Sequence, residues 1–464
     1  MPNSYLFYDL ETSGLNKCFD QVLQFAAIRT DLNLNEIDRH EIFIKLNPDV
    51  VPSPTAILVN GISLDKIQDG KCEHEAIKKI HELFNTPGTI SVGYNSLGFD
   101  DEFLRFSFYR NLLAPYTHQY ANDCGRMDLY PMAVIYYLFK PDIMDWPKID
   151  GAPTLRLEHL SRQNNLMKGA AHNAMNDVVA TLGLARLLKK EEKMWEYLCG
   201  AFNKKTDLAR LNKLSMGDEQ RTILIDGSLG GARFYQSVVV GLGTHSYYKN
   251  QSLWLPVDNF SLAGINRDNI SEKTFASRKR FGESPILLPF TKRFTHHLSD
   301  ERLELMEENI DWLRKNQGLF LEISDYYKNY QYPEIPGLDI DAALYQVGFR
   351  SDQDQMECSY FQSADSEAKI DLVDRFFNTN SRTQAIRILG RNYVEVLAKN
   401  KDLYQEFASY LKKVRSGSMV NYKNEVRMSP QAALAEIEVL SQTRELSKKE
   451  KGLLEELAKY IQSY

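Results

Sequence analysis

The stretch Tyr5-Leu6-Phe7-Tyr8-Asp9-Leu10-Glu11-Thr12 joins an apolar, aromatic run to a pair of acidic residues. The run is typical of a buried β-strand. Because side chains alternate along a strand, Asp9 and Glu11 are predicted to project their carboxylates from one face. Carboxylates that lie so close repel each other, and water or a cation must offset the repulsion. Two acids at a strand end are also common in ordinary structures, so this motif alone does not establish a site.

A second acidic motif, Tyr94-Asn95-Ser96-Leu97-Gly98-Phe99-Asp100-Asp101-Glu102-Phe103-Leu104, follows the short apolar run 89–94. We expect a strand end, a glycine-containing turn, and a helix over 101–112 that opens with acidic residues. Asp100 stands where a helix N-cap belongs, and capping alone would explain it. Spacing alone leaves Asp100 and Asp101 as alternative candidates for a site.

A third motif, Ala171-His172-Asn173-Ala174-Met175-Asn176-Asp177, precedes a strongly helical stretch. His172 comes just before the predicted helix and Asp177 near its first turn, so both can point toward one site. A histidine near a helix start is more often an ordinary polar residue than a catalytic base, and an isolated H-x(4)-D has little specificity.

The three motifs together are much more specific than any one of them, because they occur in one order on a strand, a turn and a helix. The carboxylates of Asp9, Glu11, Asp100 and Asp177 could hold two Mg²⁺ ions about 3.5–4 Å apart, an arrangement that serves phosphoryl displacement. Oxygen ligands select hard cations such as Mg²⁺ or Mn²⁺ over zinc. A bound ion would lower the pKa of a water, and neutral His172 would take its proton, since imidazole has a pKa near 6.5.

The chain of 464 residues is long for one domain, and two or three domains are expected. Strand and helix patterns alternate up to about residue 190, which predicts a sheet covered by helices. Residues 222–258 contain β-branched and aromatic runs broken by glycines, typical of hairpins. Helical periodicity marks the segments 366–378, 382–399, 402–414, 430–442 and 446–463. We therefore predict an α/β domain over 1–190, a β-domain over 191–350 and an all-helical domain over 351–464.

The composition indicates the cellular setting. Five scattered cysteines form no C-x-x-C pair, which argues against a disulfide framework and a zinc ribbon and favours a reducing compartment. The N-terminus lacks a secretion signal and no run of about 18 apolar residues occurs, so we expect a soluble, cytoplasmic protein, without a membrane partner and monomeric. The net charge is −6, so a nucleic acid would have to bind local basic patches. The segment 278–294 is one such patch, although a solvated charged face is the alternative.

The order D-x-E-T, N-x-x-x-F-D-x-x-F-L and H-x(4)-D resembles the DEDDh 3′→5′ exonuclease superfamily. The likeness extends to 24–31, 108–111 and 156–160, where the chain is similar to the bacterial exodeoxyribonuclease I family. This resemblance implies an RNase H-like exonuclease domain, an SH3-like β-domain and a helical domain, in that order. It also implies stepwise hydrolysis of single-stranded DNA from the 3′ end to nucleoside 5′-monophosphates, in DNA repair and recombination. Asp100 is the aspartate followed by x-x-F-L, which favours it over Asp101 as the ligand.

The resemblance further suggests which residues contact the strand. Single-strand binders combine cationic side chains with aromatic rings on which bases stack. The positions that resemble the family's DNA-contacting side are Glu11, Thr12, Arg105, Tyr116, Tyr120, Lys140, Arg156 and Tyr197. Tyr116 and Tyr120 could equally be core residues. Basic residues such as Lys140 are also expected to dock the acidic C-terminal tail of the single-stranded-DNA-binding protein.

Two alternatives stay open. A 3′→5′ exoribonuclease or a proofreading exonuclease would share the core, but would not need the long region after residue 190. A non-catalytic nucleic-acid-binding protein with a degenerate site is disfavoured, because all four carboxylates and the histidine are present.

Overall fold

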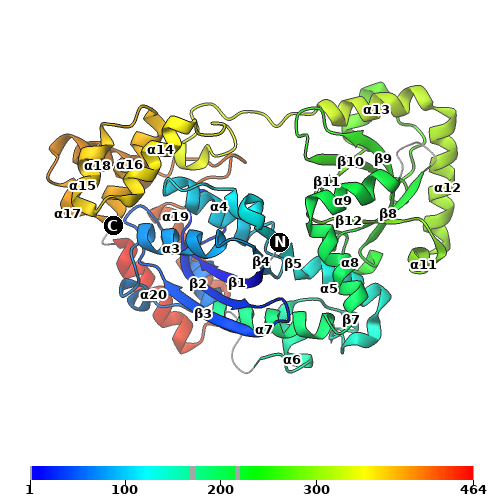
Figure 1. Cartoon of the computed structure of the whole chain (residues 1–464), viewed down its shortest axis with the longest axis horizontal. Helices are drawn as coiled ribbons and strands as arrows, with labels where there is room; N and C mark the ends of the chain where they lie inside the picture. Colours follow the sequence, from blue (N-terminus) through cyan, green and yellow to red (C-terminus); the bar gives the residue numbers. More distant parts are fainter. Residues whose placement is uncertain (1–2, 168–172, 215–219, 463–464) are drawn as a thin grey trace.

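The computed structural model describes residues 3–167, 173–214 and 220–462. Figure 1 shows a first sheet near the middle of the molecule, a second sheet on one side of it, and a helical C-terminal part on the other. None of the helices in the described residues has both the length and the apolar composition needed to cross a membrane.

The first sheet has five strands in the order β3-β2-β1-β4-β5. Their bounds are β1 Ser4–Thr12, β2 Val22–Thr30, β3 Glu36–Phe43, β4 Thr89–Gly93 and β5 Gly125–Asp128. Strands β1, β2 and β3 are antiparallel neighbours, whereas β1, β4 and β5 run parallel. The strands predicted for the apolar runs that begin at Tyr5 and at residue 89 are confirmed as β1 and β4. Strand β3 was not foreseen, because this edge strand is largely exposed and rich in charged residues, which is usual at sheet edges.

Helices cover both faces of the first sheet. Helices α3 (Glu73–Phe84) and α4 (Asp100–Arg110) pack on the face that carries Leu6, Tyr8 and Leu10 of β1. Helices α5 (Leu129–Phe139) and α7 (Ala174–Leu188) pack on the face that carries Tyr5 and Phe7. Asp9 and Glu11 continue the alternation of Tyr5 and Phe7, so their side chains point toward the α7 face. The shorter helices of this region are α1 Pro54–Asn60, α2 Leu64–Gln68 and α6 Leu157–Gln163, with a small ribbon of β6 Lys148–Ile149 and β7 Ala152–Pro153.

The second sheet is antiparallel, with the order β11-β10-β9-β8-β12. Its strands are β8 Arg221–Ile225, β9 Gln236–Thr244, β10 Gln251–Pro256, β11 Ser277–Arg280 and β12 Ile286–Pro289. The predicted hairpins over 222–258 are confirmed. The same region also contains helices that the prediction of a β-domain did not include: α8 Glu192–Cys199, α9 Lys204–Leu211, α10 Ile270–Lys273, α11 Lys292–Thr295, α12 Asp300–Lys315 and α13 Gln317–Asn329.

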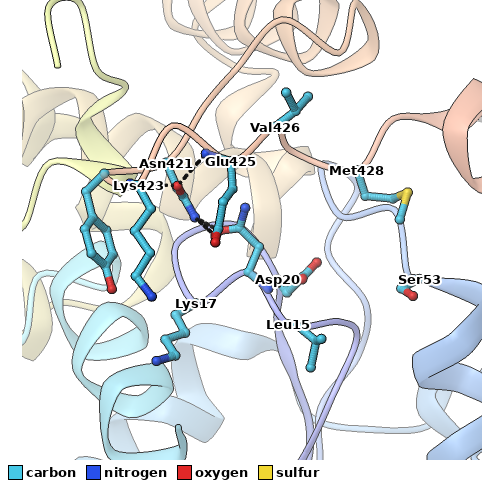
Figure 2. Close-up of a pocket in the computed structure, with 11 residues that line it drawn as sticks. Leu15, Lys17, Asp20, Ser53, Asn421, Lys423, Glu425, Val426 and Met428 are labelled. Carbon is cyan, nitrogen blue, oxygen red and sulfur yellow. Dashed lines mark hydrogen bonds between the residues drawn. The ribbon is translucent and has the colours of Figure 1, made fainter. Parts of the chain in front are cut away.

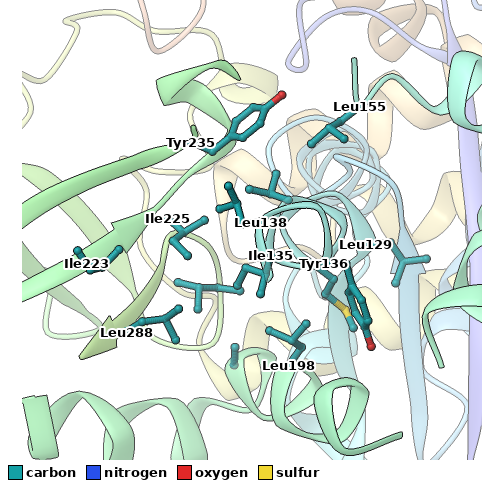
Figure 3. Close-up of a cluster of buried hydrophobic side chains, with 14 of the residues drawn as sticks. Leu129, Ile135, Tyr136, Leu138, Leu155, Leu198, Ile223, Ile225, Tyr235 and Leu288 are labelled. Carbon is teal, nitrogen blue, oxygen red and sulfur yellow. The ribbon is translucent and has the colours of Figure 1, made fainter. Parts of the chain in front are cut away.

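The two sheets share one continuous cluster of buried side chains (Figure 3). Helix α5 lies between them, with Leu129 and Tyr136 in contact with the first region and Ile135 and Leu138 near the second sheet. Its sequence, LYPMAVIYYLF, is apolar on every side, as expected of a helix buried all round. The second sheet therefore shares its core with the first. The predicted boundaries at 190 and 350 stay predictions.

The C-terminal part is helical, as predicted. Its helices are α14 Asp352–Ser363, α15 Ser366–Val373, α16 Thr379–Asn392, α17 Val394–Leu397, α18 Lys401–Arg415, α19 Pro430–Thr443 and α20 Lys448–Gln462. Helices α19 and α20 pack against α1 and α2 of the first region. A buried ion-pair group, in which Asp49 binds Arg391 (2.7 Å) and Arg427 (3.2 Å), also joins the two parts. The segment between α13 and α14 crosses from the second sheet to these helices (Figure 1).

Candidate active site

Three of the predicted ligands converge at the end of β1. One carboxylate oxygen each from Asp9, Glu11 and Asp177 lies within 4.8 Å of the others. Strand alternation brings Asp9 and Glu11 to one face, and the first turn of α7, which packs on that face, supplies Asp177. The convergence that the sequence predicted for these three side chains is present in the structure.

Asp100 adds a fourth negative charge from the start of α4. Strands β1 and β4 are parallel, so their carboxyl ends share one edge of the sheet, and the turn after β4 leads directly into Asp100. The side chain of Asp100 is buried and interacts electrostatically with Asp9 and Glu11. The motifs on β1, α4 and α7 therefore meet around one acidic centre.

Burial and mutual repulsion make this centre hold protons when no cation is present. Burial is the main cause that raises the pKa of Asp9 well above its usual range, and the charges of Asp100, Asp177 and Glu11 add to it. Burial and the charge of Asp177 raise the pKa of Glu11 to about 7. Burial, with Asp128, Glu11 and Asp101, raises the pKa of Asp100 to about 8. A divalent cation would remove this repulsion, and a donor set made only of carboxylate oxygens fits a hard ion such as Mg²⁺.

Asp101 has a different environment from its neighbour Asp100. Its carboxylate is fully buried and binds Nη2 of Arg105 (2.6 Å), Nη1 of Arg126 (2.6 Å) and Nε2 of His118 (3.0 Å). Although burial opposes ionisation, Arg126 and Arg105 hold the pKa of Asp101 well below its usual range. The Asp101 carboxylate is therefore taken up by an ion-pair network, whereas the charge of Asp100 interacts with Asp9 and Glu11.

The turn before Asp100 is held by Asp128, which the sequence reasoning did not single out. The Asp128 carboxylate accepts hydrogen bonds from the backbone N–H groups of Asn95 (2.7 Å) and Leu97 (3.3 Å). It also caps α5 by accepting from Tyr130 N–H (2.9 Å). Arg126 and His118 were missed as well. The spacing of Asp101 and Arg105 at i and i+4 was the available signal for this network.

His172 lies outside the described residues, so its role stays a prediction. The described chain resumes at Asn173, directly before α7. Arg156, also predicted to contact DNA, is exposed at the N-terminus of α6.

Arg105 and Thr12, two of the predicted DNA contacts, are buried and hydrogen-bonded within the protein. Arg105 is only 5% exposed, and its guanidinium binds Asp101 and the hydroxyl of Tyr345 (3.0 Å). The guanidinium of Arg105 thus holds Asp101 in this structure, and its contact with DNA stays a prediction. The Thr12 hydroxyl, also buried, donates to the carbonyl of Gly14 (2.8 Å). It stabilises the turn that follows Glu11.

The predicted aromatic contacts are more accessible. Tyr120 is 71% exposed, and Tyr116 is partly exposed with its ring edge against Phe349 at a centroid distance of 5.9 Å. The exposed ring of Tyr197 lies under the guanidinium of Arg210, 4.0 Å away. Lys140 is exposed and pairs with Glu191 at 3.1 Å.

The basic segment 278–294 forms a less continuous patch than its sequence indicates. Lys279 is completely buried, and its ammonium pairs with Asp207 at 2.7 Å. Arg278 and Arg280 flank it on β11 and lie on the opposite, accessible face. The prediction of a surface patch is thus corrected to these alternate residues and to Lys292 and Arg293, which are exposed on α11.

A cavity of about 360 Å³ adjoins the turn after Glu11 (Figure 2). One wall is the 13–20 loop with Leu15, and the other is the 421–428 loop of the C-terminal part, with Lys423 and Val426. Leu15 follows Glu11 by four residues, so it lies within about 14 Å of that residue along the chain. The C-terminal part therefore lies beside the loop that follows Glu11.

Similarity to known proteins extends over most of the chain. Residues 6–185 match a family described as exonuclease, and residues 338–464 match the exonuclease I C-terminal domain. Exodeoxyribonuclease I of Escherichia coli (strain K12) is 32% identical over 375 residues, which are 76% of this chain and 78% of the relative. A crystal structure of E. coli exonuclease I with a dA16 oligonucleotide has a TM-score of 0.87 at 25% identity, over 99% of each chain. A crystal structure of SSB/exonuclease I with the inhibitor CFAM has a TM-score of 0.84 at 26% identity, over 100% of each chain.

Proposed function

Because the chain belongs to the exodeoxyribonuclease I family and is a 3′→5′ exonuclease of single-stranded DNA, we propose that its acidic centre performs this hydrolysis with two bound Mg²⁺ ions. The observation that supports the proposal is the convergence of Asp9, Glu11 and Asp177, with Asp100 in electrostatic contact. Carboxylate oxygens are the ligands that Mg²⁺ prefers. We also propose a role in DNA repair and recombination, on the basis of the family.

Each side chain has a role in this proposal. Asp9 and Glu11 on β1 and Asp177 on α7 would hold the ions, and Asp100 would complete the set. The ions would lower the pKa of the attacking water and stabilise the charge that develops on the phosphate. His172 takes the proton from that water, as a neutral imidazole can near pH 7. The water oxygen bonds to phosphorus as the bond from phosphorus to the 3′ oxygen of the preceding nucleotide breaks. That oxygen takes up a proton from solvent and becomes the new 3′ hydroxyl, and a nucleoside 5′-monophosphate is released.

Digestion of 3′-labelled single strands of DNA and RNA, side by side, tests the substrate. We expect DNA to be shortened stepwise from its 3′ end and RNA to persist. Faster loss of the RNA would favour the exoribonuclease alternative.

The raised pKa values predict how metal-free stability depends on pH. A carboxyl whose pKa is higher in the folded state stabilises the fold below its unfolded pKa of about 4 and loses that contribution as the pH rises. For Glu11 and Asp100 the loss is complete above the folded-state values of about 7 and about 8. The melting temperature in EDTA should therefore fall between pH 5 and pH 8. Mg²⁺ at about a hundredfold its Kd should restore about 2.7 kcal/mol at the higher pH.

The matched control for this experiment is the Asp9→Asn/Glu11→Gln double variant. Without these two charges the melting temperature in EDTA should depend less on pH and should respond little to Mg²⁺. An equal response to Mg²⁺ in the variant and the wild type would place the metal elsewhere.

We propose further that a cavity of about 480 Å³ beside α5 receives the acidic C-terminal tail of the single-stranded-DNA-binding protein. The cavity is lined by Tyr137, Leu138, Phe139, Pro141, Arg293, His296 and His297. Tyr137 and Phe139 give the cavity an apolar wall, and the Phe139 ring packs behind it on Phe294 at a centroid distance of 5.1 Å. Lys140 follows Phe139, and its half-exposed pair with Glu191 contributes little to stability. A carboxylate of the tail can therefore replace Glu191.

A charge-reversed Lys140→Glu/Arg293→Glu variant should bind a labelled acidic tail peptide at least about tenfold more weakly, because two attractive charges become repulsive. Fluorescence anisotropy at low and high salt would measure this, and the difference should shrink as salt screens the charges. Lys399→Glu, at an exposed lysine of the C-terminal part, is the control and should bind like the wild type. Unchanged affinity in the double variant would exclude this cavity as the docking site.

The proposed place of action is the cytoplasm, and the proposed state is a monomer. The five cysteines are free thiols in the described structure, which suits a reducing compartment.

A further inference from the structure

Strand β5 holds the turn that carries Asp100 through two of its side chains. It is the edge strand of the first sheet, on the side of the second sheet (Figure 1). Arg126 and Asp128 are two positions apart in β5, so they project from the same face of the strand. Asp128 binds backbone N–H groups of the turn before Asp100. Arg126 binds the carboxylate of Asp101, directly after it, at 2.6 Å. Asp100 is thus restrained from both sides along the chain.

Arg126 also reaches the second sheet. Its Nη2 atom binds Oε1 of Glu283 at 2.7 Å, and Glu283 lies in the turn between β11 and β12. Although burial opposes the charged guanidinium, Asp101 and Glu283 raise the pKa of Arg126. A planar guanidinium can bind two carboxylates through separate N–H groups in a fixed geometry, which an ammonium group does not provide. Arg126 therefore links the helix that begins with Asp100 to the second sheet.

Glu283 is itself held in place by the buried Lys279. The backbone carbonyl of Glu283 accepts a hydrogen bond from the Lys279 ammonium. The same ammonium pairs with Asp207 of α9 at 2.7 Å. The carboxylate of Asp207 also accepts a hydrogen bond from the backbone N–H of Gly282 (2.8 Å). The buried lysine thus fixes the turn that presents Glu283 to Arg126.

Glu283 also balances the charge of the network around Asp101. Arg105 and Arg126 share the Asp101 carboxylate, so these three side chains together carry one positive charge in excess. Burial lowers the pKa of His118, the third partner of Asp101, so His118 adds no charge at neutral pH. Glu283 supplies the second negative charge from a side chain that is 17% exposed. Loss of this charge would weaken the restraint on the Arg126 guanidinium, because a buried charge needs its partners.

We propose that Arg126 and Glu283 are positioning residues for the metal-binding carboxylate of Asp100. Glu283 fixes the guanidinium of Arg126. Arg126 fixes Asp101 and so places the neighbouring Asp100 in the acidic centre. This inference rests on the proposed function, in which that centre holds metal ions. The second sheet thus contributes to metal affinity, although the four proposed ligands all lie in the first region.

The test is direct binding of Mn²⁺ to a Glu283→Gln variant, measured by electron paramagnetic resonance without DNA. Groups that orient metal ligands from outside change metal affinity by about 10–100-fold, so we expect the Kd for Mn²⁺ to rise about tenfold. The Mg²⁺ concentration for half-maximal hydrolysis should rise by the same factor, while kcat at saturating Mg²⁺ stays close to that of the wild type. Glu283→Asp keeps the charge and should bind Mn²⁺ more tightly than Glu283→Gln.

A double-variant comparison shows whether Glu283 acts through Arg126. In an Arg126→Lys background, Glu283→Gln should weaken Mn²⁺ binding little further, because the shared route is already broken. Glu307→Gln is the matched control, because Glu307 forms another ion pair with an arginine of the second sheet, Arg221, at 2.6 Å. It should bind Mn²⁺ like the wild type.

Wild-type Mn²⁺ affinity in Glu283→Gln would overturn the inference, and this comparison does not depend on the folding of Arg126→Lys. Fully additive losses in the double variant would also overturn it, because Glu283 would then act by another route. If the wild type itself bound no Mn²⁺, the proposed function would fail instead.

Discussion

An Asp9→Asn variant is expected to lose about a thousandfold in kcat on single-stranded DNA, because a charge that holds the metal ions is worth several kcal/mol in the transition state. We chose Asp9 for this variant because the charges of Asp100, Asp177 and Glu11 all interact with its carboxylate. Single-turnover hydrolysis of a 3′-labelled strand, at saturating Mg²⁺, would measure the loss.

The same variant should not be less stable than the wild type in EDTA. The burial and repulsion that raise the pKa of Asp9 make its charge unfavourable in the metal-free fold, so asparagine relieves a cost. Asp371→Asn, at an exposed aspartate of α15, is the control and should hydrolyse DNA normally. Wild-type kcat in Asp9→Asn would refute the site, and a lower melting temperature with the same loss of rate would attribute that loss to unfolding.

The sequence predicted the parts of this site that depend on local rules. Strand alternation placed Asp9 and Glu11 on one face, and the position of Asp177 in the first turn of a helix directed it toward them. Each of these inferences needs only the chain within a few residues. That β1 and α7 come together at one site could be predicted only from the order of the three motifs, because no single motif carries that information.

The sequence did not show which partners would hold two of the basic residues. Arg105 was predicted to contact DNA from the resemblance to the family, and in the structure Asp101, four residues before it, and the distant Tyr345 hold it in the interior. Lys279 was assigned to a surface patch, but Asp207 pairs with it beneath the second sheet. A buried charge is stable only with such a partner. Sequence patterns do not show which carboxylate of the fold will pair with a basic residue. Whether a single basic residue is exposed is therefore poorly predicted from the sequence.

Asparagine substitutions at the neighbouring residues Asp100 and Asp101 are expected to have large and opposite effects. Asp101→Asn should lower the free energy of unfolding by about 3–5 kcal/mol, because it leaves the guanidiniums of Arg105 and Arg126 buried without their shared charge. The pKa of Asp101 lies well below its usual range. Its contribution is therefore present at neutral pH and is lost only as the pH falls below about 4. Urea unfolding at pH 7 and at acid pH would measure both the loss of unfolding free energy and its dependence on pH.

Asp100→Asn should show the opposite behaviour, because the charge it removes is unfavourable in the metal-free fold. We expect its stability in EDTA to equal or exceed that of the wild type near pH 8, while kcat falls by about two orders of magnitude or more through loss of a metal-binding charge. The two variants differ by one position in the chain and remove the same charge, so each is the control for the other. If Asp101→Asn were stable and inactive while Asp100→Asn were unstable and active, the ligand would be Asp101. The ion-pair network would then rearrange on metal binding, since Arg105, Arg126 and His118 would have to release that carboxylate.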